Sequence, residues 1–202
     1  MTKTQEFKTV FTENFDGALS HEWLLPLSGM IRTKEGMKGS SALVLERTKV
    51  NAEDYKRACA TRNLKLVPQK YYRLTAYYRT DGIPDGLRIG TIMSISADKG
   101  EPTYPSDPPY GKQPPFPKNS KDWKETALIF QAGKENLLKL SMWWSVYGKA
   151  WWDNIRVEEV LSNQGMLYPI TPMLNLDDEG NLLVKCHMWG IPKEALGKYR
   201  AI

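Results

Sequence analysis

The feature that most constrains the fold of this chain is a series of strand-like runs separated by turn residues. Alternating, β-branched and aromatic residues recur in short runs between Gly, Pro and Asp breakers, whereas helical periodicity is scarce. The expected strands are Lys8–Thr12, Ser41–Glu46, Arg57–Leu64, Tyr71–Thr80, Leu87–Ala97, Lys124–Gln131, Leu137–Val146 and Trp151–Val160. Strands of this number without helices between them predict an all-β fold, a two-layer sandwich or jelly roll.

The chain divides into a main part and a short tail. Its 202 residues, of which 41% are hydrophobic, suffice for one substantial domain with a packed core. After a polar segment that begins at residue 162, the pattern Leu174–Leu176, Asp177–Gly180, Leu182–Met188 is typical of a hairpin. We therefore expect a domain over residues 1–161. Residues 162–202 are expected to form a linker and a β extension, which either packs on the sandwich or begins a further domain.

Two runs show which side chains share a face. In the run 71–80, Tyr72, Leu74, Ala76 and Tyr78 form a core-like set, while the opposite set contains Tyr77, Arg73 and Arg79. In the run 137–147, the apolar set is Leu138, Leu140, Met142, Trp144 and Val146, and the opposite set is Lys139, Ser141, Trp143, Ser145 and Tyr147. The pattern therefore places Trp144 in the core and Trp143 in a polar row, where an indole suggests a ligand.

The second tryptophan doublet is divided in the same way. Simple alternation places Trp151, Ile155 and Val157 in one phase, with Asp153 inward, and Trp152 and Asn154 in the other. A proline-rich segment over residues 99–123 cannot form a central strand and is expected to be a long loop. Its Tyr104 and Tyr110 either form a wall beside a binding face or pack onto the edge of the sandwich.

Charge, cysteine and histidine content argue against several classes of protein. The net charge of +5 is spread among 23 acidic residues without a basic run, so a nucleic-acid interface is not expected. Cys59 and Cys186 predict neither a disulfide framework nor a zinc site, and two histidines do not favour a histidine-based triad. No apolar stretch approaches the roughly 20 residues that cross a bilayer, and no apolar leader opens the chain.

Five short motifs in order over residues 10–160 resemble the carbohydrate-binding modules with a galactose-binding-like jelly-roll fold that often accompany glycoside hydrolases. They are NFDGALSHEW, GMKGSSALVLE, KYYRLTAYYRT, DWKETALIFQAG and GKAWWDNIRVEEV. The proline-rich insertion is longer than is typical of the family, and the segment from residue 162 has no counterpart in a single module. The resemblance implies a secreted or periplasmic protein and an adjoining catalytic domain.

The same resemblance implies a structural calcium ion. In that family an N-terminal acidic residue, nearby backbone carbonyls and the aspartate of the last strand hold the ion. The matching positions here are Asp16 and Asp153, with Glu13 as the alternative to Asp16. Calcium takes six to eight oxygen ligands, so two carboxylates and carbonyl groups suit it chemically. The alternative is that Asp153 caps a turn or pairs with a lysine.

The leading functional hypothesis is a non-catalytic module that binds an oligo- or polysaccharide. A pyranose stacks its C–H face on an aromatic ring, and its hydroxyls need polar partners beside that ring. The candidate platform is Trp143, Tyr147, Tyr77, Arg73 and Arg79, with Trp152, Tyr104 and Tyr110 as secondary candidates. The net charge of +5 also raises the hypothesis that the glycan is acidic.

Two other functions compete with this hypothesis. A sandwich-fold glycosidase would need paired carboxylates, which Glu158 with Glu159 or Asp177 with Asp178 and Glu179 would have to supply. The first pair alternates between two faces and the second set lies in a turn, and no nucleophile elbow, phosphate loop or HExxH motif occurs. Alternatively, the tryptophan-rich face docks another protein, because aromatic residues and arginine also anchor protein interfaces.

Overall fold

The computed structural model describes residues 7–26, 29–48, 59–83, 91–105, 119–142 and 146–161, and the backbone of four short strands after them. Apart from one 3-10 helix at Met37–Gly39, the regular elements of these residues are strands. The main strands are β1 (Phe7–Glu13), β2 (Trp23–Leu24), β3 (Gly29–Arg32), β4 (Ala42–Arg47), β5 (Cys59–Asn63), β6 (Tyr71–Asp81), β7 (Thr91–Ala97), β8 (Lys124–Gln131), β9 (Asn136–Met142) and β10 (Gly148–Val160). The prediction of an all-β chain is confirmed.

The larger sheet has six antiparallel strands in the order β3-β4-β10-β6-β8, with β1 also paired to β10. Strand β10 is the longest and holds the sheet together, because β6 pairs along one of its edges. On the other edge β4 pairs with the first half of β10 and β1 with the second half. The smaller sheet has four antiparallel strands in the order β2-β5-β9-β7.

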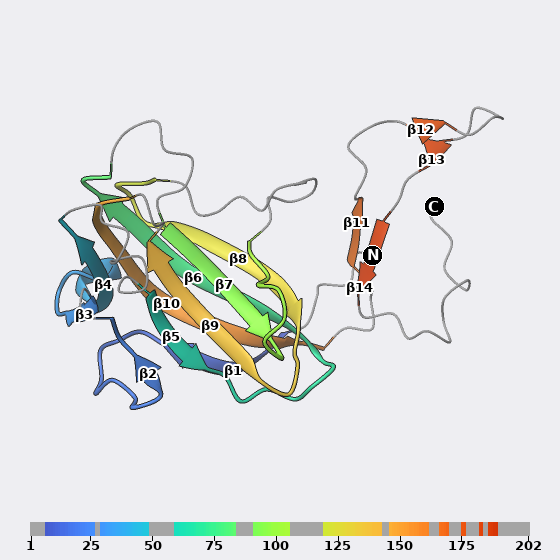
Figure 1. Cartoon of the computed structure of the whole chain (residues 1–202), viewed down its shortest axis with the longest axis horizontal. Coiled ribbons are helices and arrows are strands. Elements are labelled where there is room, and N and C mark those ends of the chain that lie inside the picture. Colours follow the sequence, from blue (N-terminus) through green and yellow to red (C-terminus); the bar gives the residue numbers. More distant parts are fainter. Residues whose placement is uncertain are drawn as a thin grey trace.

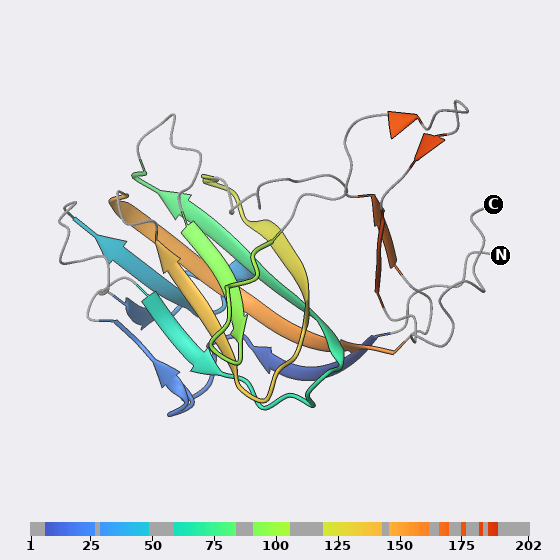
Figure 2. The same ribbon diagram turned by 45° about the vertical axis from the view of Figure 1, so that its right-hand side comes forward.

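The two sheets lie face to face and enclose one core (Figures 1 and 2). The six-stranded sheet contributes Leu43, Leu45, Tyr72, Leu74, Tyr78, Leu128, Phe130, Trp152, Ile155 and Val157, and the four-stranded sheet contributes Trp23, Ala60, Met93, Ile95, Leu138, Leu140 and Met142. The alternating phases expected for the runs 71–80 and 137–142 are confirmed, since the apolar set of each is buried. Burial of these side chains is the main force that holds the two layers together.

A β-bulge in β10 reverses the side-chain phases of the second tryptophan doublet. Between Asp153 and Arg156, β10 advances three residues while β6 advances two, and Asn154 adopts a φ of 47°. Asparagine tolerates this left-handed conformation better than most residues, and an extra residue shifts the alternation by one position. Trp152 therefore joins Ile155 in the core, and Trp151 lies on the opposite face, which corrects the phases expected from simple alternation.

The C-terminal strands pair only with each other among the described residues. β11 (Met166–Pro169) pairs with β14 (Cys186–Trp189), and β12 (Asn175–Leu176) pairs with β13 (Leu182–Leu183). The second pair confirms the expected β extension. Strands β2 and β3 were not expected from the sequence, because they are only two and four residues long. A search of the described part of the chain for a long apolar helix that could cross a membrane finds none.

Candidate functional site

The acidic residues assigned to calcium come together at a loop between β3 and β4. The Asp153 carboxylate is fully buried, and its Oδ2 accepts hydrogen bonds from the Met37 backbone N–H and the Ser40 hydroxyl, each at 2.8 Å. Asp16 Oδ1 accepts a hydrogen bond of 2.6 Å from the backbone N–H of Ser41, the residue after Ser40. The GMKGSS segment therefore donates hydrogen bonds to both aspartates.

Gly36 makes this close approach possible. A Cβ atom at Gly36 would lie 2.8 Å from Asp153 Oδ2 and still closer to backbone and side-chain oxygens of the same loop, distances that real Cβ atoms do not show. Only glycine therefore lets the loop close over the carboxylate. The glycines of this segment were a usable sequence signal for the site.

Burial raises the pKa of Asp153, and the neighbouring Asp16 carboxylate acts in the same direction, while hydrogen bonds from Met37, Ser40 and Asn154 partly oppose them. A buried carboxylate beside a second one is the arrangement that a cation would relieve. The Asp153 carboxylate oxygens already accept hydrogen bonds from Met37, Ser40 and Asn154, so a cation would add to or replace these bonds. No group of three or more acidic, histidine or cysteine side chains occurs among the described residues, so carbonyl oxygens would have to complete such a site.

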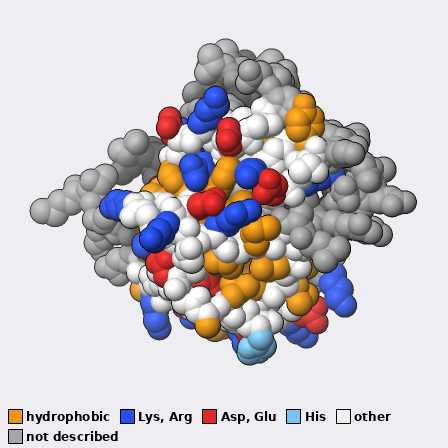
Figure 3. All heavy atoms as spheres, turned by 90° about the vertical axis from the view of Figure 1, so that its left-hand side faces the viewer, with side chains coloured by type: hydrophobic (Ala, Val, Ile, Leu, Met, Phe, Trp, Pro, Cys, Tyr) orange, Lys and Arg blue, Asp and Glu red, His pale blue; other side chains and the backbone are white. Residues whose placement is uncertain are grey.

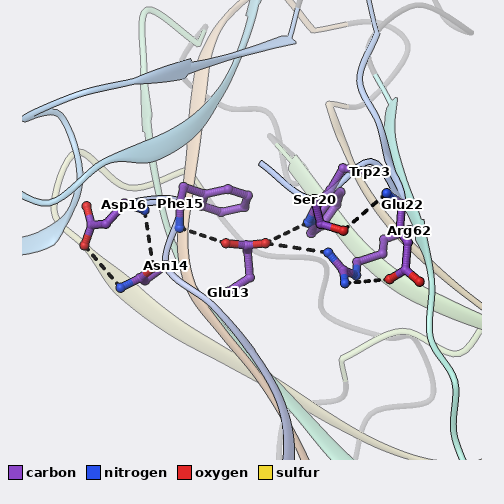
Figure 4. Close-up of polar contacts among 8 residues, drawn as sticks. All are labelled: Glu13, Asn14, Phe15, Asp16, Ser20, Glu22, Trp23 and Arg62. Carbon is purple, nitrogen blue, oxygen red and sulfur yellow. Dashed lines mark hydrogen bonds and ion pairs between the residues drawn. The ribbon is translucent and has the colours of Figure 1, made fainter. Parts of the chain in front are cut away.

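Glu13 belongs to a different group of residues (Figure 4). Its Oε2 accepts a hydrogen bond of 3.1 Å from the Trp23 indole N–H and lies 3.6 Å from the Arg62 guanidinium, and its Oε1 accepts one from the Phe15 amide. Arg62 also pairs with Glu22 at 2.8 Å and lies over the rings of Phe11 and Trp23. Glu13 is therefore engaged in linking β1 to the four-stranded sheet, which leaves Asp16 as the partner of Asp153.

The candidate residues on the six-stranded sheet are largely engaged with one another. Arg79 lies over the Trp151 ring at 4.3 Å and near the Trp123 ring at 5.4 Å, and Trp151 donates a 2.7 Å hydrogen bond to Glu35. Arg73 donates two hydrogen bonds to one oxygen of Glu158, at 2.6 and 3.0 Å. It also lies 3.7 Å above the Phe7 ring. These guanidinium groups already have partners on the sheet.

The expected platform does not lie on one face. Tyr77, Arg73 and Arg79 lie on the outer face of β6, in the six-stranded sheet, whereas β9, the strand that precedes Trp143, belongs to the four-stranded sheet. The outer faces of two stacked sheets point away from each other, so these groups cannot contact one glycan face together. The sequence pattern gave each residue a face of its strand but could not place the strands in sheets.

The other candidates lie in different places. Trp152 has no exposed surface and packs against Tyr78, with ring centroids 5.8 Å apart, so its assignment as a sugar-binding residue is corrected. Tyr147 is 44% exposed just before β10, and Tyr104 is half-buried beside the Ile95–Thr103 bridge. Trp143, Trp144 and Tyr110 lie outside the described residues.

The outer face of the four-stranded sheet carries a group of small polar side chains around one lysine. We call this group the polar sheet face and define it as Thr61, Ser94, Ser96, Lys139 and Ser141. The two β7 serines are buried, and the β5 and β9 members are half-buried. Cys59 borders the group, and burial raises the pKa of its thiol. Hydroxyls and an amine at this spacing can bond the hydroxyls of a sugar.

Glu158 and Glu159, the candidate carboxylate pair that the structure describes, are both engaged in ion pairs. Glu158 pairs with Arg73 and Arg156, and Glu159 pairs with Lys70. The turn that contains Asp177 lies outside the described residues.

Charges of both signs mix on the face of the sandwich that is turned toward the viewer in Figure 3. On β3, β4 and β10, Glu46 lies 3.5 Å from Arg32 and 3.1 Å from Lys149, and Arg32 also lies near Glu35. Such interspersed pairs contribute little stability individually and make no extended basic patch on this face.

Comparisons with known proteins define the class of fold. No protein-family model matches the chain, and no curated protein matches it by sequence. Among solved structures, the CBM22-1 xylan-binding domain of Xyn10C from Paenibacillus barcinonensis aligns with a TM-score of 0.56 and 9% identity, covering 79% of this chain and 99% of that domain. A xylan-binding domain from CBM 22 aligns with a TM-score of 0.50 and 14% identity, covering 76% of this chain and 95% of that one.

A third similar structure contains a catalytic module as well. The CBM22-1 and GH10 modules of Xyn10B from Clostridium thermocellum, complexed with xylohexaose, align with a TM-score of 0.50 and 14% identity. The match covers 75% of this chain and 29% of that one. The chain therefore has the jelly-roll fold of carbohydrate-binding modules, as the sequence motifs suggested.

Proposed function

We propose that this chain is a non-catalytic carbohydrate-binding module that binds a polysaccharide. The observation that carries the proposal is the likeness of its sandwich to a xylan-binding domain over 99% of that domain's length. A sandwich with one polar outer face suits extended glycan chains, which need hydroxyl partners along a surface more than a closed pocket. The xylan-binding domains among the similar structures make xylan the first polysaccharide to test.

We place the glycan on the polar sheet face, where Thr61, Lys139 and Ser141 are half-buried and make no ion pair with a described residue. On the opposite sheet, Arg73 and Arg79 are held by Glu158, Phe7 and two tryptophans. Lys139 and Ser141 instead lie in a row on β9 that leads directly toward Trp143 at the next position after the strand. The alternation of the sequence predicts Trp143 in the same row, where its indole would supply the stacking ring beside these polar groups.

Trp143→Ala is expected to weaken binding of soluble xylan by about tenfold or more, because an aromatic ring in a binding site is commonly an energetic anchor. Tyr77→Ala is the matched control: it removes an aromatic ring from the outer face of the other sheet and is expected to leave the affinity unchanged. Affinity gel electrophoresis measures both variants. Equal losses in the two, or a loss only in Tyr77→Ala, would contradict the placement.

The resemblance also supports a structural calcium ion at Asp16 and Asp153. The ion would have these two carboxylates and carbonyl oxygens of the Gly36–Ser41 loop as its ligands. The raised pKa of the buried Asp153 and its nearness to Asp16 support this proposal. A bound divalent ion would neutralise both carboxylates and fasten the loop to β10.

Calcium at about one hundred times its Kd is expected to raise the melting temperature by about 5 °C or more, because a ligand that binds only the folded state stabilises it. Because the pKa of Asp153 is raised in the folded state, its contribution in metal-free protein favours folding below its ordinary pKa and is lost as the pH rises through the raised value. Calcium needs the ionised form. The calcium effect should therefore be small near about pH 4 and full near about pH 7.

Asp153→Asn should abolish the calcium effect on melting, and the exposed Asp122→Asn should retain it. Differential scanning calorimetry with calcium or with EGTA measures the effect. Equal melting temperatures of the wild-type protein under the two conditions at neutral pH would rule out the site.

We further propose that the module adjoins a glycoside hydrolase in the protein to which it belongs, as the xylan-binding modules of the Clostridium thermocellum structure adjoin a GH10 module. In that arrangement the binding module raises the local concentration of the enzyme on its polymer. Comparing polymer hydrolysis by the complete natural protein with and without this module tests the arrangement.

A further inference from the structure

We propose that the polar sheet face recognises an acidic polysaccharide and that Lys139 binds its anionic group. This inference rests on the proposed carbohydrate-binding function and specifies the chemistry of the ligand. The anionic group is a carboxylate or a sulfate, which share the charge and the acceptor oxygens that an ammonium group recognises.

Lys139 occupies the centre of the polar sheet face. In the antiparallel register, Lys139 on β9 lies opposite Thr61 on β5 and opposite Ser94 on β7. Ser141 lies two residues along the same strand and therefore on the same face. Hydroxyl-bearing residues therefore flank the Lys139 position on both neighbouring strands and along its own strand.

The charge of Lys139 is not balanced within the described part of the chain. Two of the described lysines are half-buried, Lys139 and Lys149. Lys149 has an acidic partner, Glu46 at 3.1 Å, whereas Lys139 makes neither an ion pair nor a hydrogen bond with a described residue. A partly desolvated cation without a counter-charge is costly unless something else supplies the charge.

The neighbouring positions do not supply it. The described residues of this face on β5, β7 and β9 include Cys59, Asn63, Ile92 and Leu137 beside the polar group, and no acidic side chain is among them. The outer face of the other sheet differs, since its Arg73 is paired with the buried Glu158. The missing anion on the polar sheet face is therefore best explained as part of the ligand.

The hydroxyls decide between an anion alone and an anionic sugar. Thr61 and Ser141 are half-buried beside Lys139, and their hydroxyls can donate to and accept from sugar hydroxyls. Ser94 and Ser96 are buried and border this pair. An isolated phosphate or carboxylate would not need so many groups that both donate and accept. The combination of one cation with several hydroxyls fits a saccharide that carries one negative group per binding site.

The test compares Lys139→Met with Lys124→Met, which removes the same charge from an exposed position on β8 in the other sheet. Affinity electrophoresis is run with neutral xylan, with glucuronoxylan as the carboxylate polymer, and with dextran sulfate beside dextran as the sulfate arm. The wild-type protein is expected to bind an acidic polymer at least about fivefold more tightly than its neutral counterpart, and Lys139→Met should lose that difference. Lys124→Met should keep it. Circular dichroism confirms that both variants are folded.

The outcomes separate this inference from the function on which it rests. If the protein binds neutral xylan and does not prefer either acidic polymer, carbohydrate binding stands and the inference is overturned. Equal losses in Lys139→Met and Lys124→Met, with the preference disappearing in salt, would show a general charge effect and overturn it too. If no polysaccharide binds under any condition, both proposals fail. Preference for only one of the two acidic polymers identifies the anionic group.

Discussion

Replacement of Trp152 by alanine is expected to lower the free energy of unfolding by about 3 to 5 kcal/mol. The indole has no exposed surface, contacts the Tyr78 ring across a centroid distance of 5.8 Å and belongs to the central cluster between the sheets. The change would leave a cavity beside the longest strand, which pairs with β1, β4 and β6. Urea denaturation followed by fluorescence and circular dichroism measures the loss.

Trp152→Phe tests the packing of the same side chain with a smaller change in volume. The Trp152 indole N–H is buried and finds no hydrogen-bond partner among the described residues, and phenylalanine removes this unpaired donor while filling part of the space. An unpaired buried donor costs stability, so removing it offsets part of the smaller ring's lost packing. The loss is expected to be about 1 to 2 kcal/mol. A Trp152→Ala protein as stable as the wild type would contradict the burial of this side chain.

Arg62→Met is expected to cost about 3 to 5 kcal/mol, because it leaves the Glu13 carboxylate without its buried cation. Glu22 keeps Lys65 as a partner at 3.1 Å. The Arg62 guanidinium is 9% exposed, pairs with Glu22 and lies near Glu13, and covers the rings of Phe11 and Trp23. These contacts connect β1 of the larger sheet with β2 and β5 of the smaller one (Figure 4). Methionine has a similar apolar stem, so most of the loss comes from the missing charge.

Arg156→Met is the matched control for that variant. Arg156 has 55% of its side chain exposed and lies 3.7 Å from Glu158, which keeps Arg73 as a closer partner. An exposed pair of this kind is worth at most about 1 kcal/mol. Equal losses in the free energy of unfolding for Arg62→Met and Arg156→Met would show that the buried ion pairs of Arg62 stabilise the protein no more than an exposed pair does.

The sequence pattern predicted strands well where successive side chains alternate between the core and the outer face of a sheet. Strand β6 shows this best: Tyr72, Leu74, Ala76 and Tyr78 are buried as expected, because alternate side chains must point to opposite sides of a sheet. The bounds of β8 also agree with the expected run. The eight expected strands all occur, and the loop glycines marked the place where Asp16 and Asp153 meet.

The alternation of apolar and polar residues predicted the wrong faces for one strand, because this pattern does not reveal a β-bulge. In β10, Asn154 takes a left-handed conformation and adds one residue opposite β6, so every side chain before it changes face relative to those after it. As a result, Trp152 lies in the core and Trp151 on the outer face, the reverse of the prediction. An asparagine in a strand is compatible with such a bulge but does not require it, since its pairing partner lies some 75 residues away in the sequence.

The sequence by itself determined the strands and the side on which most of their residues lie, because hydrophobic burial and strand geometry act over a few residues. Only the tertiary structure decided that β6 and β9 belong to different sheets. Tyr77 and Lys139 therefore lie on opposite outer faces of the sandwich. The tertiary structure also decided which cations have partners among the described residues: Arg73 pairs with Glu158 across two neighbouring strands, and Lys139 lies between Thr61 and Ser94 in the register without an ion pair. Pairing between distant strands depends on the whole fold, and for that reason no local pattern contained it.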